Sequence, residues 1–197
     1  MDDPISSPVP KKMKKVHKKN CYDPRYSDNW NTPQRAYEAI KPYVEEYVKT
    51  HGIQQLVIWD PFFNADAGTS EKYLKEVFPD AVIIHKDVWV DLDNPIIPDF
   101  ARDVNLIITN PPYSKKNKLT TTKWMKDMEL PFMSLMPMET TMLKCMRPLL
   151  KDDNLQMIIP NGRLSFENKD GATSSAPLGT AWFCFGMGFD NTMNFLD

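Results

Sequence analysis

Short runs of apolar residues, each closed by polar or turn-forming residues, recur along this chain and predict an alternation of strands and helices. The predicted strands lie at residues 55–60, 81–87, 105–109, 132–137, 155–159 and 181–185. The predicted helices lie at residues 33–49, 69–78 and 139–150. This alternation indicates an α/β fold, in which ligands bind beyond the carboxyl ends of the strands.

The first predicted helix has a well-defined start. Thr32 is expected to be its N-cap and Pro33 its first helical residue, because a hydroxyl accepts a bond from a free backbone N–H and proline fits the first turn. A helix N-terminus also attracts carboxylates. The same two residues are equally consistent with an ordinary surface helix.

The strand at residues 105–109 ends abruptly at Asn110-Pro111-Pro112-Tyr113. Two consecutive prolines cannot continue a central strand, because neither donates to the ladder. The strand end would therefore hold one amide side chain, stiff backbone carbonyls and one aromatic ring. Such an acceptor-rich corner suits a planar ring that carries an NH2 group. The simpler interpretation is a turn that closes a strand.

A second strand, at residues 55–60, ends in Asp60 followed by a proline. If this strand and the strand at residues 105–109 are neighbours where the strand order reverses, Asp60 and Asn110 face one crevice. Taken alone, Asp60 would be an ordinary acid at a strand end. At the end of the next strand, Asp87 is the candidate for binding ribose hydroxyls, and His85 is a less typical one.

The composition favours one intracellular domain. The chain has 197 residues and a net charge of −2, but residues 11–19 hold six lysines and one histidine. We expect residues 1–22 to form a disordered basic tail and residues 23–197 to form a single domain. The tail could bind phosphates, act as a nuclear import signal or only increase solubility. Three scattered cysteines argue against a disulfide framework. We expect no membrane span and no metal.

The tetrad at residues 110–113 resembles the catalytic motif of S-adenosylmethionine-dependent amino-methyltransferases, above all those that act on N6 of adenine in nucleic acids. Residues 60–63, Asp-Pro-Phe-Phe, and residues 30–33, Trp-Asn-Thr-Pro, resemble the cofactor motifs of that family. Arg163, in a Gly-Arg-Leu segment, resembles part of a pattern in compact viral and phage enzymes. The chain departs from the family at residues 64–68, where Gly-x-Gly is replaced by Asn-Ala-Asp-Ala-Gly.

The resemblance implies a class I, Rossmann-like methyltransferase fold, with a mostly parallel seven-stranded sheet, helices on both faces and one antiparallel strand near the end. It also implies S-adenosyl-L-methionine as cofactor. The implied catalytic residues are Asn110, Pro111, Pro112 and Tyr113. The cofactor-binding residues that we assign are Trp30, Asn31, Thr32, Asp60, Pro61, Phe62, Phe63, Asp87 and Asn110.

The expected substrate is DNA first and RNA second, in a nuclear, cytoplasmic or viral setting. The loops expected to face it are residues 114–122 and 166–180, and the substrate-binding residues that we assign are Ser114, Lys115, Lys116 and Arg163. The intervals between the motifs leave no room for a separate target-recognition domain. Either the sequence preference is therefore slight, or the substrate is single-stranded or RNA, or a partner subunit supplies recognition.

Three alternatives stay open. The amine could be cytosine N4, RNA guanine N2 or a protein glutamine, although glutamine methylases normally keep the Gly-x-Gly loop. The chain could be a catalytically silent subunit that binds nucleic acid, which the altered loop at residues 64–68 favours and the intact tetrad opposes. It could also be a nuclear or viral replication factor that keeps the fold for binding alone.

Overall fold

The computed structural model describes residues 30–62, 68–86, 98–151, 155–167, 173–175 and 179–196. Its helices are α1 (Gln34–Thr50), α2 (Gly68–Val77), α3 (Lys115–Asp127) and α4 (Arg147–Lys151), with 3-10 turns η1 (Asp99–Asp103) and η2 (Met138–Met142). Its strands are β1 (Val57–Trp59), β2 (Val82–Ile84), β3 (Leu106–Thr109), β4 (Phe132–Pro137), β5 (Gln156–Ile159), β6 (Ser165–Glu167), β7 (Thr173–Ser175), β8 (Thr180–Phe185) and β9 (Met193–Phe195).

The described strands form one seven-stranded sheet and a separate two-stranded hairpin. The order in the large sheet is β2-β1-β3-β4-β8-β5-β9, and the hairpin pairs β6 with β7. Strand β8 runs antiparallel to both of its neighbours, β4 and β5, while the other pairs in the sheet are parallel. The sheet is therefore mixed, with six strands in one direction and β8 in the other, as the sequence analysis predicted.

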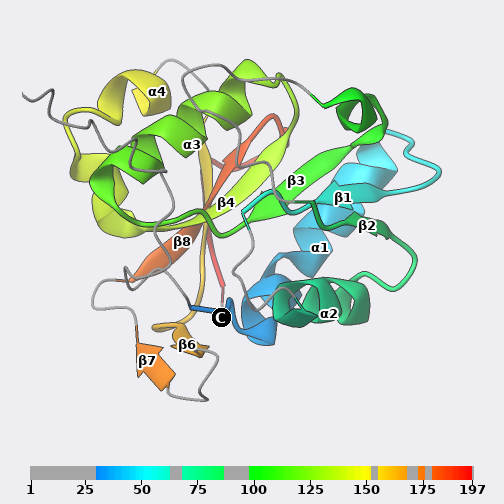
Figure 1. Cartoon of the computed structure of the whole chain (residues 1–197), viewed down its shortest axis with the longest axis horizontal. Coiled ribbons are helices and arrows are strands. Elements are labelled where there is room, and N and C mark those ends of the chain that lie inside the picture. The colour runs from blue at the N-terminus through cyan, green and yellow to red at the C-terminus, as the bar shows by residue number, and fades with distance from the viewer. Residues whose placement is uncertain are drawn as a thin grey trace, which may run out of the picture.

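Helices cover both faces of the sheet (Figure 1). Alternate residues of each strand point to opposite faces, so Ile58 packs beneath α1 and α2 while its neighbour Trp59 packs toward α3. The same alternation separates Ile108 from Ile107 on β3. The result is a three-layer α/β/α arrangement with one apolar core on each side of the sheet.

Most of the predicted elements are confirmed, but two regions were wrong. The segment predicted as one helix at residues 139–150 is η2 followed by the short helix α4. Pro148 lies in the first turn of α4, where its missing N–H costs nothing, instead of ending a longer helix. Residues 114–122, expected to be a loop, are the start of α3, which Ser114 caps by accepting a bond from the Asn117 N–H.

The start of α1 lies one residue later than predicted. Pro33 occupies the N-cap position, Gln34 is the first helical residue, and no side chain caps the helix. The Thr32 hydroxyl is instead hydrogen-bonded to the Tyr37 side chain. Thr32 therefore faces the interior of the protein instead of closing the helix end.

Several predictions fall outside the described residues. These are the basic tail at residues 1–22, the altered loop at residues 64–67, Phe63 and Asp87. The division into tail and domain stays a prediction. Within the described ranges, no helix is both long and apolar enough to cross a bilayer.

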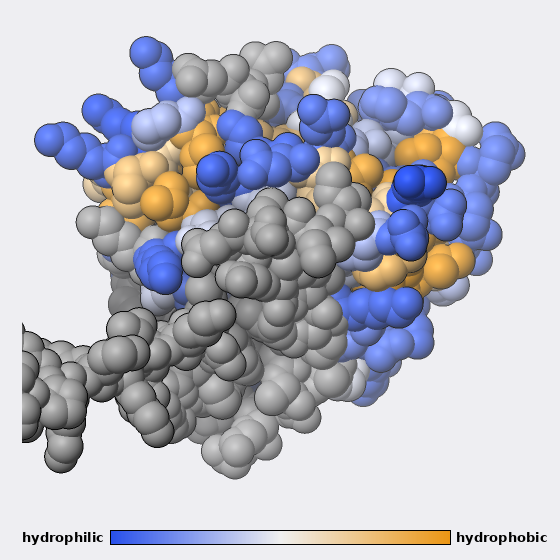
Figure 2. All heavy atoms as spheres, turned by 45° about the horizontal axis from the view of Figure 1, so that its top comes forward, coloured by the Kyte–Doolittle hydropathy of each residue, from blue (hydrophilic) through white to orange (hydrophobic). Residues whose placement is uncertain are grey.

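The outer surface of the α3 and α4 side is mainly hydrophilic. Figure 2 brings this side forward and shows polar side chains with apolar residues visible between them. On α3 the exposed residues include Lys116 and Lys123, while Trp124 and Met125 are buried against the sheet. This one-sided burial explains why a segment rich in lysine and threonine forms a helix.

Removing a side chain from the sheet core should destabilise the protein strongly. Ile108→Ala opens a cavity at a fully buried position of β3 and should lower the free energy of unfolding by about 2–5 kcal/mol. The control is Val82→Ala on the edge strand β2, where the side chain is 48% exposed and the loss should stay below about 1 kcal/mol. Urea denaturation measures both, and equal losses would contradict the described core.

Candidate active site

The candidate site lies where the strand order reverses, between the carboxyl ends of β1 and β3. Chain order places β2 on one side of β1 and β3 on the other, which makes this gap the switch point of the sheet. The two strands pair in parallel, with Trp59 opposite Ile107. Asp60 and Asn110 therefore follow neighbouring strand ends, as the sequence analysis predicted.

A hydrogen bond joins these two strand ends. Thr109, the last residue of β3, donates its hydroxyl to Asp60 Oδ1 over 2.7 Å. Both side chains are almost fully buried, so little water competes for the bond. The bond therefore fixes Thr109, and Asn110 directly after it, relative to Asp60 at the end of β1.

A crevice opens above this junction. It draws residues from the segment before α1, from α1 itself, from the ends of β1 and β3, and from the start of α2. Its lining residues are Trp30, Asn31, Thr32, Tyr37, Asp60, Phe62, Ser70 and Asn110. Aromatic rings, hydroxyls, one acid and one amide thus surround a single space.

Asp60 is the most enclosed charged group of the crevice. Burial raises the pKa of its carboxyl, while hydrogen bonds from Thr109, from Ser70 and from the backbone N–H of Phe62, together with nearby His85, oppose that shift. These donors and His85 favour the ionised carboxylate, whereas burial, the largest effect, favours its neutral form and keeps the pKa above the usual value. When ionised, the buried carboxylate attracts a cationic ligand group.

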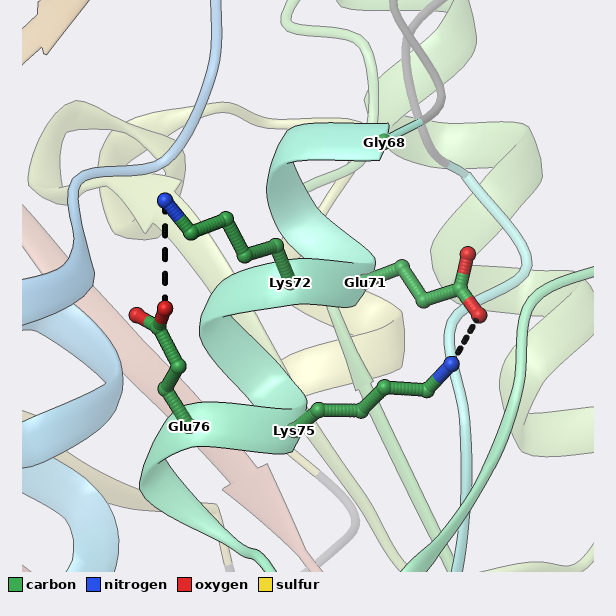
Figure 3. Close-up of a pocket in the computed structure, with 5 residues that line it drawn as sticks. All are labelled: Gly68, Glu71, Lys72, Lys75 and Glu76. Carbon is green, nitrogen blue, oxygen red and sulfur yellow. Dashed lines mark hydrogen bonds and ion pairs between the residues drawn. The ribbon is translucent and has the colours of Figure 1, made fainter.

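His85, at the end of β2, stands beside Asp60. Its Nε2 lies 3.1 Å from Ser70 Oγ and 3.9 Å from Asp60 Oδ2, and its Nδ1 lies 3.8 Å from Glu71 Oε2. Burial lowers the pKa of His85, against the opposing attraction of the two carboxylates. Glu71 is also held by Lys75 in the first turns of α2, as Figure 3 shows.

Asn110 brings an unsatisfied acceptor to the crevice. Its Oδ1 is buried and has no hydrogen-bond partner among the residues that the structure describes. A buried carbonyl without a donor costs about 1–3 kcal/mol, so such an atom in a native fold calls for an explanation. The two prolines that follow are buried and restrict the backbone, which keeps the Pro111 carbonyl from turning away.

Tyr113, the last residue of the tetrad, contacts the β6–β7 hairpin. Its ring is partly exposed and meets Phe166 of β6 edge to face, with 6.5 Å between ring centroids and an interplanar angle of 85°. The hairpin is also tied to the segment before α1, because the Asn31 N–H donates to the Glu167 carbonyl over 2.7 Å. The structure thus brings part of the loop predicted at residues 166–180 next to the site.

The residues assigned to the substrate are less closely grouped. Ser114 and Lys116 are exposed at the start of α3, and only the backbone of Lys115 is described. Arg163 is exposed, and its carbonyl accepts a hydrogen bond from the Arg35 side chain. Lys118, within the segment 114–122 that we expected to face the substrate, is buried and pairs with Glu139 at 3.4 Å.

The structure also adds residues that the sequence analysis did not assign. Tyr37 lines the crevice from the first turn of α1, one turn after Pro33, a spacing that helical periodicity could have revealed. Ser70 lies within the first turn of α2 and contacts Asp60 and His85. Nothing in the sequence marked Thr109 as a site residue except its position at the end of a predicted strand.

The remaining predicted cofactor residues, Pro61 and Phe62, are both buried. The Phe62 ring reaches the core on the α3 side, 5.5 Å from the Trp124 ring, while the residue also lines the crevice. Within the described residues, no group of three or more histidines, cysteines or acids could hold a metal ion.

Comparison with known proteins gives little beyond this geometry. No family model matches the chain, and no curated protein sequence matches it. Among solved structures, the methyltransferase subunit of a type I restriction-modification system from Streptococcus thermophilus is similar, with a TM-score of 0.49 and 10% identity. The similarity covers 86% of this chain but 47% of that subunit, so the chain spans about half its length. At this level the similarity carries no functional argument.

The bond between the strand ends can be tested by an isosteric change. Thr109→Val removes the donor to Asp60 Oδ1 and should lower the free energy of unfolding by about 1–3 kcal/mol. Thr122→Val is the matched control, because its buried hydroxyl contacts only the weak acceptor Met136 Sδ, at 3.8 Å, among its described hydrogen bonds. Denaturant titration of both variants should rank Thr109→Val as the more damaging, and the reverse order would contradict the arrangement.

Proposed function

We propose that this chain is a methyltransferase of the class I fold, which uses S-adenosylmethionine to methylate N6 of adenine in nucleic acid. DNA is the substrate that we favour, and RNA is the second candidate. The observation that carries the proposal is the buried, unsatisfied Oδ1 of Asn110. It stands at the end of β3, beside a crevice that holds a buried acid.

The chemistry of adenine explains that acceptor. The exocyclic nitrogen is a poor nucleophile, because its lone pair is delocalised into the ring. An NH2 group that donates to both Asn110 Oδ1 and the Pro111 carbonyl is drawn toward tetrahedral geometry, which exposes the lone pair. Rigid prolines hold these acceptors in place before the substrate arrives, so little order is lost in the reaction.

The crevice residues suit the cofactor. When bound, S-adenosylmethionine would supply an electrophilic methyl group on a positively charged sulfur. Asp60 and the aromatic rings of Trp30, Tyr37 and Phe62 are suitable neighbours for cationic groups. The start of α1, just after Thr32, is suited to a carboxylate.

The proposed transfer is direct. The adenine nitrogen attacks the methyl carbon in line with the breaking carbon–sulfur bond, the bonding pair stays on sulfur as a thioether, and the nitrogen then loses one proton to solvent. Asn110 and Pro111 orient the amine, and Tyr113 stacks on the base. Exposed Lys116 and Arg163 are available for phosphates.

Asn110, which we assigned to both the catalytic and the cofactor-binding residues, should be essential for transfer but contribute little to cofactor affinity. Asn110→Ala should lower the rate of methyl transfer to nucleic acid by about 10²-fold or more, as for other lost pre-organised hydrogen-bond partners, and leave the Kd of S-adenosylmethionine nearly unchanged. Asn161→Ala, in the exposed turn after β5, is the matched control and should keep full activity. If Asn110→Ala instead lost affinity for the cofactor, Asn110 would bind the cofactor and not the target amine, which would contradict the proposed role.

Tyr113 should act through its ring. Tyr113→Ala removes a stacking interaction of about 1–3 kcal/mol and should raise KM for the nucleic acid, whereas Tyr113→Phe keeps the ring and should stay close to the native KM. Steady-state kinetics on one oligonucleotide compare the two. If Tyr113→Phe raises KM as much as Tyr113→Ala does, the hydroxyl and not the ring is the important group.

A further inference from the structure

We propose that His85 is a positioning residue of the cofactor crevice, which holds the Asp60 carboxylate in place through the Ser70 hydroxyl. The inference rests on the proposed function, because it takes this crevice as the cofactor site. It adds a residue at the end of β2 and one in α2 to the machinery assigned above.

The direction of the hydrogen bonds follows from what each group can donate. An ionised Asp60 only accepts, and its Oδ1 already receives the Thr109 hydroxyl. Ser70 is also hydrogen-bonded to Asp60, so its single proton points to that carboxylate. The Ser70 oxygen is then free to accept, and His85 Nε2, 3.1 Å away, is placed to donate to it.

This assignment fixes the tautomer of His85. Nε2 carries the proton, which leaves Nδ1 as the other ring nitrogen, 3.8 Å from Glu71 Oε2 and beyond normal hydrogen-bond distance. Glu71 Oε1 is held 2.6 Å from Lys75 Nζ, so that carboxylate is stabilised from its other side (Figure 3). The charged groups around the imidazole are therefore Asp60 of the β1 end and Glu71 and Lys75 of α2.

The relay joins four elements of the fold. It runs from His85 at the end of β2 to Ser70 in α2, then to Asp60 after β1 and Thr109 of β3. Both the His85 and Asp60 side chains are more than nine-tenths buried. Ser70, the link between them, is half-buried at the wall of the crevice. Because both ends of this link lie out of water, loss of one donor should shift its neighbours.

The consequence is an indirect role in cofactor binding. His85 need not touch the cofactor, since it orients the hydroxyl that orients the acid. A side chain that offers the same donor without an imidazole should therefore suffice. Glutamine, whose amide nitrogen can take the place of Nε2, meets that requirement.

The test is calorimetric binding of S-adenosylmethionine to the full chain and four single variants. His85→Ala and Ser70→Ala should each weaken binding about tenfold, the loss expected for one hydrogen bond in a charged network. His85→Gln should stay near the native Kd. His51→Ala, at the exposed end of α1, is the matched control and should bind as the native chain does.

A double variant separates a relay from two independent contacts. If His85 acts through Ser70, the variant that carries both alanines should bind about as weakly as Ser70→Ala alone. If the double variant loses affinity by the product of the two single losses, the relay is contradicted. It is also contradicted if His85→Gln binds the cofactor as weakly as His85→Ala does. Native affinity in all of the single variants would overturn the inference and leave the proposed function standing. No binding by the native chain would overturn both.

The tautomer gives a readout that needs no cofactor. Long-range 1H–15N spectra of the native chain should show His85 with the ring proton on Nε2 and not on Nδ1, a pattern that Ser70→Ala should perturb. The opposite tautomer would overturn the proposed direction of the bonds. Because this spectrum also checks that each variant is folded, a weak Kd from misfolding would be recognised.

Discussion

The candidate site depends on one buried hydrogen bond, from Thr109 to Asp60, which joins the carboxyl ends of β1 and β3. Parallel strands at a reversal of strand order leave an open gap at their ends, and this bond fixes the two sides of that gap relative to each other. On one side the acid is held by Thr109, Ser70 and the Phe62 backbone. On the other, the chain passes directly into Asn110 and two prolines.

The rigidity of this second side is what makes an unsatisfied acceptor tolerable. In a flexible segment, Asn110 Oδ1 would turn toward water or a backbone N–H and regain a hydrogen bond. Here Thr109 is anchored before it and two buried prolines follow it, so the side chain keeps an orientation that costs free energy. Stored strain of this kind is typical of sites where a ligand supplies the missing partner.

The sequence predicted the parts of this arrangement that depend on local pattern. Strands that end in Asp60 and Asn110 were visible as apolar runs closed by a proline, and their adjacency followed from the rule on parallel sheets. The relay through Ser70 and His85 was not predicted, because it depends on contacts between elements that are far apart in the chain. Helix α3 was missed because Asn117 and the three threonines at residues 120–122 have weak helix propensity, whereas burial of Trp124 and Met125 against the sheet favours the helix.

The most direct measurement is the identity of the methylated product. The purified full chain is incubated with labelled S-adenosylmethionine and a panel of single- and double-stranded DNA and RNA oligonucleotides, and the products are digested to nucleosides and identified by mass. We predict N6-methyladenine from at least one polymer. Label on cytosine, on guanine or on the protein itself would contradict it, as would the absence of labelled product from a chain that binds the cofactor.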